Sequence, residues 1–168
     1  FDATRLLFDF RASPDSGFRI WEVNLDGTGL RQVTFSPPDE AEKVARWGKP
    51  WHTDDIHPAY LADGSIVFSS TRCEHTILCG GSAALVAPVL HRMDADGGGI
   101  RTLSYNDVSE WFPAVSRSGH VLHARWDYID RDAVTHQNVW ATRPDGTNPV
   151  AVWGNASPSP HCAFQLQP

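Results

Sequence analysis

The stretch from His57 to Arg72 reads HPAYLADGSIVFSSTR and holds two short apolar runs on either side of the turn sequence Ala-Asp-Gly-Ser. An Asp-Gly pair suits a tight reversing turn because glycine adopts positive φ without steric cost. The pattern returns from Phe112 to Trp126 as FPAVSRSGHVLHARW, at about the spacing expected of repeated sheet units. The two stretches therefore predict two equivalent β-hairpins.

A further motif lies between these hairpins and consists of a strand, an Asp-Gly turn and the start of another strand. Its copies read IWEVNLDGTGLR from Ile20, LHRMDADGGGIR from Leu90 and VWATRPDGTN from Val139. Asp94-Ala95-Asp96-Gly97 also suggests a calcium loop, but the remaining oxygen ligands of such a loop are missing, so we expect a plain turn. Helical periodicity is weak except over residues 38–47, where one or two turns are expected.

In chain order the motifs predict an all-β chain built from four-stranded antiparallel units. The predicted units span residues 5–34 (without a first strand), 57–104, 112–153 and the start of another at 161–168. Units of this length are typical of β-propeller blades, and rings have about four to eight of them. We therefore expect a segment of a larger, six-bladed ring, with two complete blades and parts of two others.

The predicted connections alternate between long and tight along the whole chain. Successive connections of an up-and-down sheet lie at opposite ends, so every long loop is expected on one face of the ring. Binding residues concentrate on elaborate loops that a rigid scaffold carries. The loop-rich face is therefore the predicted binding face.

Composition narrows the range of partners. The 168 residues are 41% hydrophobic and 20% charged, which suits one globular domain with its own core. A net charge of −6 without a basic cluster argues against nucleic acid. No apolar run approaches the roughly 20 residues of a membrane span. The first residue is Phe1, so we expect that the natural N-terminus lies upstream.

With the blades laid out, the chain resembles the WD40-like, TolB-type six-bladed propellers. Four stretches are similar to the propeller middle domain of hydrazine synthase alpha subunit-like proteins of planctomycete-type bacteria: FSSTRC (68–73), HRMDADG (91–97), SEWFPAV (109–115) and ARWDYIDRD (124–132). The resemblance implies a periplasmic or secreted setting and a larger parent protein. Hydrazine synthase works through c-type haems and a zinc near one of them. This chain has no Cys-x-x-Cys-His, so the haem attachment does not carry over and no cofactor is expected in this segment.

Cys73, His75 and Cys79 lie within seven residues at the start of a long predicted loop. Two cysteines and a histidine can hold zinc if a neighbouring loop adds a fourth ligand. A disulfide between Cys73 and Cys79, which would suit an oxidising compartment, and reduced thiols are the alternatives. The disulfide is preferred, and a third cysteine, Cys162, leaves at least one thiol unpaired within the chain.

A cluster of aromatic, acidic and imidazole side chains precedes the second predicted unit: Trp51, Asp54, Asp55 and His57. Such groups can ligate a divalent metal or form an acid–base pair. Alternatively, the acids accept hydrogen bonds from backbone amides at the strand entry. Glu110 and Trp111 occupy the same place before the third unit, and this recurrence favours the structural role.

The segment Trp126-Asp127-Tyr128 mixes aromatic and acidic side chains on another long predicted loop. It either contacts a partner, since Trp and Tyr are frequent in binding hot spots, or caps the core while its acid is solvated. Both alternatives remain open. Exposed tryptophans also offer stacking surfaces for a glycan, and the candidates are Trp47, Trp51, Trp111 and Trp126.

The leading hypothesis is a non-catalytic scaffold segment of a larger extracytoplasmic bacterial protein. Its loop-rich face would contact a protein partner or another domain or blade of the same parent, through Trp51, Asp54, Asp55, His57, Glu110, Trp111, Trp126, Asp127 and Tyr128. A second hypothesis makes this face part of a metal or haem site of a redox enzyme, with Cys73, His75, Cys79, Asp54 and His57 as ligand candidates. A third is a glycan- or small-ligand-binding propeller. No catalytic residue is assigned.

Overall fold

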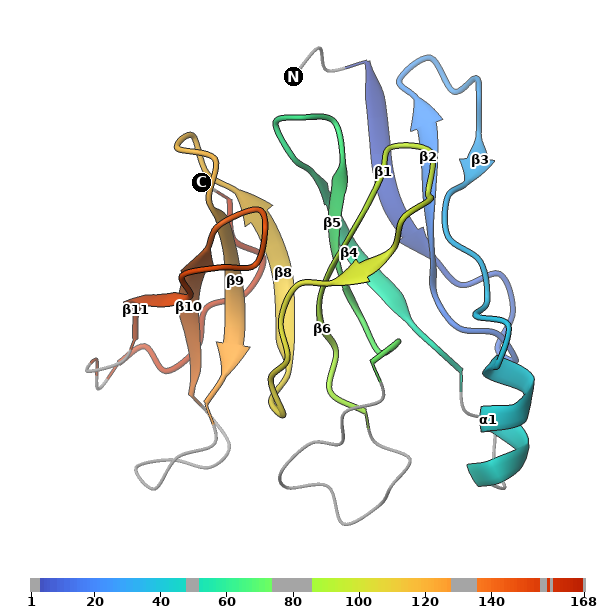
Figure 1. The fold of residues 1–168 in the computed structure, drawn as a ribbon. Coiled ribbons are helices and arrows are strands. Elements are labelled where there is room, and N and C mark those ends of the chain that lie inside the picture. Colours follow the sequence, from blue (N-terminus) through green and yellow to red (C-terminus); the bar gives the residue numbers. More distant parts are fainter. Residues whose placement is uncertain are drawn as a thin grey trace.

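The computed structural model describes residues 4–47, 52–73, 86–127, 136–154, 157 and 159–167. These residues form three antiparallel sheets that follow one another along the chain (Figure 1). The strands are β1 (Arg5–Phe10), β2 (Arg19–Asn24) and β3 (Arg31–Gln32) in the first sheet; β4 (Asp55–Tyr60), β5 (Ile66–Ser70), β6 (Val89–Met93) and β7 (Arg101–Thr102) in the second; and β8 (Glu110–Val115), β9 (Val121–Trp126), β10 (Gln137–Thr142) and β11 (Val150–Trp153) in the third. One helix, α1 (Glu40–Trp47), is present in this part of the chain. The all-β prediction is confirmed.

Glycine-containing turns join neighbouring strands as the sequence predicts. In the β4–β5 turn, Gly64 N–H donates to Leu61 O at 3.0 Å and Leu61 N–H donates to Ser65 O at 2.8 Å. Gly64 has φ +83°, a conformation that residues with a Cβ rarely adopt. Asp94 and Gly98 close the β6–β7 turn in the same way, so Asp-Ala-Asp-Gly forms a tight turn.

The strand registers divide the molecule into two ends. Phe10 pairs with Arg19, Asp55 with Ser70, and Gln137 with Trp126, so these residues mark one end of their sheets. We call it the loop end, because α1 and the strand ends that lead into the long connections lie there (Figure 1). The opposite end, where the glycine turns lie, is the turn end.

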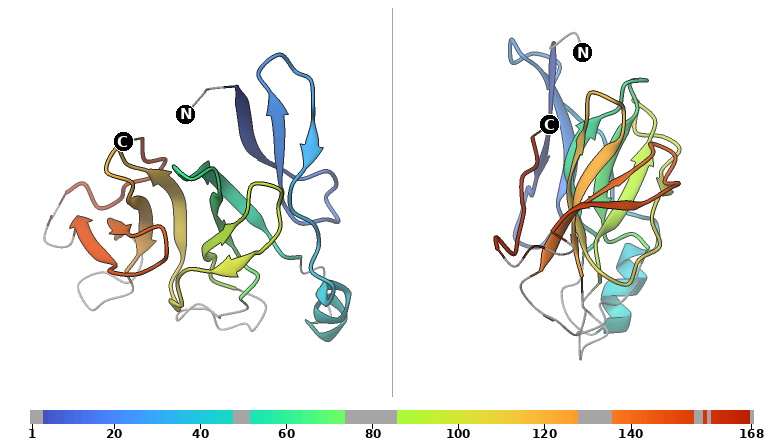
Figure 2. Two further views of the ribbon diagram at one scale, coloured as in Figure 1. Left: turned by 45° about the horizontal axis from the view of Figure 1, so that its top comes forward. Right: turned by 90° about the vertical axis from the view of Figure 1, so that its left-hand side faces the viewer.

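The core consists of two apolar layers between successive sheets. Ile20, Val33, Ile66, Phe68 and Met93 form the layer between the first and second sheets; Leu61, Val67, Leu90, Leu103 and Val121 form the layer between the second and third. Neighbouring β5 residues enter different layers, because side chains of a strand alternate between its faces. The second sheet is thus covered on both faces, and Figure 2 shows the sheets side by side.

The first strands of the second and third sheets, β4 and β8, are called the inner strands below. They begin two residues earlier than the sequence predicts, at Asp55 and Glu110 instead of His57 and Phe112. In each strand a Pro-Ala pair follows the predicted start, and proline cannot donate to a strand ladder. The structure accommodates each proline in a β-bulge. Ile56 pairs with Ser69, the next pair is Ala59 with Val67, and β8 has the equivalent shift.

The C-terminal segment continues the repeat beyond the third sheet. Gln137 N–H donates to His161 O at 2.9 Å, and Ala163 N–H donates to Gln137 O at 3.0 Å. At the two earlier junctions, Asp55 N–H donates to Phe18 O and Glu110 N–H donates to Pro88 O, at 3.1 and 2.8 Å. Residues from Ala163 onward therefore lie where a following inner strand begins.

Candidate functional site

One residue in β4, one in β8 and one in the C-terminal segment share an unusual backbone conformation; in β4 and β8 this residue lies in the β-bulge. These residues are His57, Phe112 and Gln165, with φ of +54°, +54° and +52°. Positive φ is costly for residues with a Cβ, so its recurrence in three successive inner segments marks a shared backbone feature. The His57 ring stacks on Phe112 with ring centroids 4.0 Å apart, and Phe112 meets Phe164 edge-on at 5.8 Å.

Asp55, at the start of β4, binds side chains of its own chain. It is fully buried, and its carboxylate accepts two hydrogen bonds from Arg72, at 2.8 and 2.6 Å, and one from Ser70 Oγ at 2.7 Å. Arg72 also donates to Phe35 O at 2.7 Å, beyond the end of β3. This carboxylate therefore joins the first and second sheets at the loop end.

Glu110 holds the equivalent position in β8 and joins the second and third sheets. Its side chain is 2% exposed and accepts hydrogen bonds from Ser104, Asn106 and the Leu90 amide, with His123 Nε2 at 3.4 Å. Burial alone raises the pKa of Glu110, but the His123 contact and the Ser104 hydrogen bond outweigh it and lower that pKa. Both recurring acids thus accept hydrogen bonds from other groups of the chain at the start of an inner strand.

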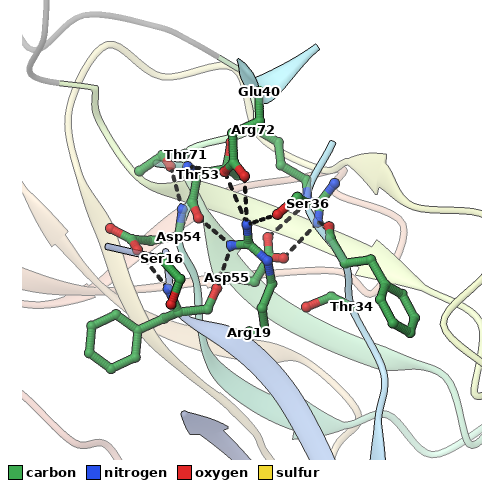
Figure 3. Close-up of polar contacts among 12 residues, drawn as sticks. Ser16, Arg19, Thr34, Ser36, Glu40, Thr53, Asp54, Asp55, Thr71 and Arg72 are labelled. Carbon is green, nitrogen blue, oxygen red and sulfur yellow. Dashed lines mark hydrogen bonds and ion pairs between the residues drawn. The ribbon is translucent and has the colours of Figure 1, made fainter. Parts of the chain in front are cut away.

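A second buried ion pair holds α1 at the loop end (Figure 3). Arg19 donates to both Glu40 carboxylate oxygens at 3.0 and 3.1 Å, and to Ser36 Oγ at 2.7 Å. Glu40 also accepts from Thr53 N–H at 2.7 Å. Burial by itself raises the pKa of Glu40, but its bonds to Ser36, Thr53 and Arg19 lower it below the usual value. Sequence reasoning missed this pair, because neither residue belongs to a repeated motif.

Asp54 and Asp127 are both engaged by neighbouring chain segments. Asp54 Oδ1 accepts from the Phe18 amide at 2.9 Å. Asp127 accepts from Asn138 Nδ2 and lies 3.5 Å from Arg125 Nε. Trp126 is half-buried. The predicted residues Trp51, Tyr128, His75 and Cys79 lie outside the described part of the chain, as does the side chain of Trp47.

A pocket of about 430 Å³ lies beside the stacked rings, lined by His57, Trp111, Phe112, Gln137 and Phe164. His57 and Trp111 were predicted from the sequence. Gln137 and Phe164 were not, because only the folded chain brings the start of β10 and the C-terminal segment to the inner strands. A neighbouring pocket of about 580 Å³ shares His57 and Phe112 and extends towards Leu7.

Two exposed aromatic side chains occupy equivalent places at the loop end. Phe35 follows Thr34, whose Oγ accepts from the Ile20 amide, and Tyr105 follows Ser104, whose Oγ accepts from the Leu90 amide. They are 63% and 76% exposed. The sequence contains a signal for this pair, since Val-Thr-Phe-Ser at 33–36 parallels Leu-Ser-Tyr-Asn at 103–106.

The predicted metal ligands are only partly described. Among the described residues, no group of three or more His, Cys, Asp or Glu side chains is arranged to hold a metal ion. Cys73 Sγ lies 4.0 Å from Ala87 O, and the zinc, disulfide and thiol alternatives all involve residues outside that part of the chain. The sequence has no Cys-x-x-Cys-His motif, through which a c-type haem would be attached to this chain. No helix in the described part is long and apolar enough to cross a membrane.

Comparison with solved structures places these sheets in a known fold. A TolB protein from Agrobacterium tumefaciens matches 90% of this chain with a TM-score of 0.61 and 19% identity. Hydrazine synthase from Kuenenia stuttgartiensis matches 94% of it with a TM-score of 0.70 and 19% identity. No protein-family model and no curated protein sequence matches the chain.

The chain spans 46% of the length of that TolB protein and 25% of the hydrazine synthase chain. At this level of identity the likeness establishes the fold. The three sheets and the segment from Ala163 have the fold of a portion of a β-propeller, as the repeats predict, and this fold is similar to that of the TolB protein and of hydrazine synthase.

Proposed function

We propose that this chain is a non-catalytic scaffold segment of a larger extracytoplasmic protein, and that its loop end contacts another domain of that protein or a protein partner. The observation that carries the proposal is the exposed pair Phe35 and Tyr105, set at equivalent positions on the loop end. Large aromatic side chains are frequent in binding hot spots, and this pair recurs at the same place in two successive sheets.

The rigidity of the loop end supports the same function. The Asp55–Arg72 and Arg19–Glu40 pairs fix the strand entries and α1. A fixed surface loses little conformational entropy on binding, which favours recognition. In this proposal Asp55 and Glu110 are buried residues that support the contact surface without belonging to it. The proposed contact residues are Trp51, Asp54, His57, Trp111, Trp126, Asp127 and Tyr128.

The edge of the first sheet at β1 supports the proposal that the chain belongs to a larger ring. Its strand β1 has no inner neighbour among the described residues, whereas the second and third sheets each have one, β4 and β8. Unpaired edges invite a further strand. We propose that an inner strand from elsewhere in the parent protein pairs with β1.

Side-chain footprinting by hydroxyl radicals tests the contact. The full-length protein that carries this chain is labelled in intact cells and again after purification and separation from its partners. We expect Phe35 and Tyr105 to be protected from modification in intact cells, whether or not they are also protected in the purified protein. Leu25 and Leu30, 65% and 61% exposed at the turn end, are the matched controls and should be modified equally in both samples.

Full modification of Phe35 and Tyr105 in both samples would contradict the proposed contact. The extracytoplasmic setting rests on the resemblance to TolB-type proteins and is tested separately. The full-length protein should be recovered in the periplasmic or secreted fraction, and recovery in the cytoplasmic fraction would contradict that part of the proposal.

A further inference from the structure

The third sheet has one face that no other sheet covers in the part of the chain that the structure describes. The three sheets stand in a row, and the third lies at one end of it, on the left in Figure 1. The second sheet, in the middle, has an apolar layer on both faces. We call the face of the third sheet that is turned away from the second sheet the outward face.

The strand registers identify Val152 as a residue of this outward face. Equivalent pairs join the last two strands of each sheet, three residues before the start of the glycine turn: Trp21 with Gln32, His91 with Thr102, and Trp140 with Ala151. The next residue along the last strand is Val33, Leu103 or Val152. Val33 and Leu103 are 2% and 7% exposed beneath the following sheet, whereas Val152 is 57% exposed.

The rest of the outward face repeats a set of residues that is packed between the second and third sheets. In the second sheet this set is Ala59, Val67, Leu90 and Leu103. The equivalent residues of the third sheet, by the same registers, are Ala114, Leu122, Val139 and Val152. All four are apolar, and covering apolar side chains is favourable in proportion to the area removed from water. The outward face therefore has the composition of a packing face.

Glycine turns show how each following sheet approaches the one before it. A Cβ at Gly97 would lie 2.3 Å from Val33 O, and a Cβ at Gly146 would lie 2.4 Å from Leu103 O. Both glycines have positive φ and belong to the turn before the last strand of the following sheet. Each of the two interfaces thus places a glycine turn on the same carbonyl, and the next carbonyl in this series is that of Val152.

The C-terminal segment shows where a following sheet would begin. Ala163 N–H donates to Gln137 O at 3.0 Å, and the equivalent bonds at the two earlier junctions run from Asp55 N–H to Phe18 O and from Glu110 N–H to Pro88 O. Two residues after each donor, the backbone has positive φ, at His57, Phe112 and Gln165. The segment from Ala163 thus repeats the backbone of β4 and β8, the first strands of the second and third sheets.

We propose that a fourth sheet, supplied by the parent protein, packs against the outward face of the third. Its first strand continues from Ala163, its apolar side chains cover Val139 and Val152, and a glycine turn lies on the carbonyl of Val152. This inference rests on the proposed function, in which the chain is a segment of a larger protein. It concerns the face of a sheet, whereas the proposed contact at Phe35 and Tyr105 lies at the loop end.

Hydroxyl-radical footprinting of the purified, monomeric full-length protein tests the cover. Val150 is the matched control, since it lies on the same strand, is 46% exposed, and is equivalent to Arg101, which stays exposed although its sheet is covered on both faces. We expect Val152 to be modified roughly tenfold more slowly than Val150, because its covered equivalent Leu103 keeps only 7% exposure. Equal modification would overturn the proposal, and so would protection confined to an oligomeric fraction, which would mean that a second copy covers the face.

Two arginine substitutions in the full-length protein give a second readout. Val152→Arg should lower the melting temperature by on the order of 5 °C, because it buries a charge without a partner. Val150→Arg should leave it unchanged, since Arg31 and Arg101 occupy the equivalent positions of the other sheets. Equal melting temperatures would contradict the cover, and if Val152→Arg does not fold, the footprinting of the unaltered protein decides.

The outcome is separate from that at the loop end. Exposed Phe35 and Tyr105 together with a protected Val152 would refute the loop-end contact and support the fourth sheet. The reverse pattern would refute the fourth sheet alone.

Discussion

Arg72 binds Asp55 through two parallel hydrogen bonds, Nε to Oδ1 at 2.8 Å and Nη2 to Oδ2 at 2.6 Å. The Asp55 side chain is fully buried and the Arg72 side chain is 15% exposed. The same guanidinium donates to Phe35 O, so the pair holds the inner strand of one sheet against the outer strand of the previous sheet. The acid that precedes the Pro-Ala pair thus links two adjacent blades through Arg72.

Arg72→Met should destabilise the protein strongly, because it leaves the Asp55 carboxylate buried without its counter-charge. Loss of one partner from a buried ion pair costs about 3–5 kcal/mol. Denaturant unfolding measures the change. The matched control is Arg46→Met, which breaks an exposed pair with Glu42 and should cost about 0.3–0.5 kcal/mol. Similar losses in both variants would show that the buried pair has no special role.

His91 should make stability fall as the pH decreases from neutral. Burial lowers its pKa below 6.5, although the Val89 carbonyl opposes this, and the neutral ring is held by Val89 O at 3.0 Å and Thr102 Oγ at 3.1 Å. The unfolded chain therefore takes up the proton first. The free energy of unfolding is highest above pH 6.5 and falls on acidification, by at most about 1.4 kcal/mol per pH unit for one proton.

Urea unfolding between pH 5 and pH 8 checks this dependence, with His91→Gln as the comparison. The variant removes the titrating ring and should have a lower free energy of unfolding at pH 8 but a flatter slope. The same slope in both proteins would rule out His91 as its source.

Glycines of equivalent turns should differ in their tolerance of a side chain. A Cβ at Gly97 would lie 2.3 Å from Val33 O of the neighbouring sheet, whereas a Cβ at Gly27 meets nothing within 4 Å. Both have positive φ, +96° and +82°, so both alanine variants suffer the same kind of backbone strain, about 1–2 kcal/mol. Gly97→Ala should lose a further 1–3 kcal/mol, roughly the cost of overpacking. Thermal unfolding of the two variants measures the difference, and equal melting temperatures would contradict the close approach.

The parts of the fold that the sequence predicts are those that local chemistry determines. Asp-Gly and Ser-Gly turns mark where each hairpin reverses, and the apolar runs between them give the strands. The strands β4 and β8 begin two residues before the predicted starts at His57 and Phe112, and Pro58 and Pro113 lie within their β-bulges. A proline inside a bulge keeps the strand pairing on both sides of it, and a single sequence does not distinguish such a bulge from the end of a strand.

The candidate site was predictable only where it repeats. The equivalent positions of Asp55 and Glu110 were visible as acids before each inner strand, and so was the hairpin residue His57. Gln137 and Phe164 come together only through contacts between distant segments, and nothing in their local sequence signals a pocket. Contacts between blades depend on how successive sheets pack against each other, and local sequence patterns do not determine that packing.

The helix α1 should depend on one buried carboxylate. Glu40 joins α1 to Arg19 of β2 and to the Thr53 amide, so Glu40→Ala leaves a buried guanidinium and a buried amide without that acceptor. The helix has 8 residues and is too short to be stable without tertiary contacts. We expect amide hydrogen exchange within α1 to accelerate by about tenfold or more, the equivalent of roughly 1.4 kcal/mol of lost protection.

Glu42→Ala is the matched control for that experiment, since it lies on the same helix and removes only the exposed pair with Arg46. Exchange in α1 should then change by less than about threefold, because exposed helical pairs contribute about 0.3–0.5 kcal/mol. Exchange in β5 should stay slow in both variants, since its five residues are all buried. Equal acceleration by the two substitutions would mean that the bond between Glu40 and Arg19 is not what holds α1 at the loop end.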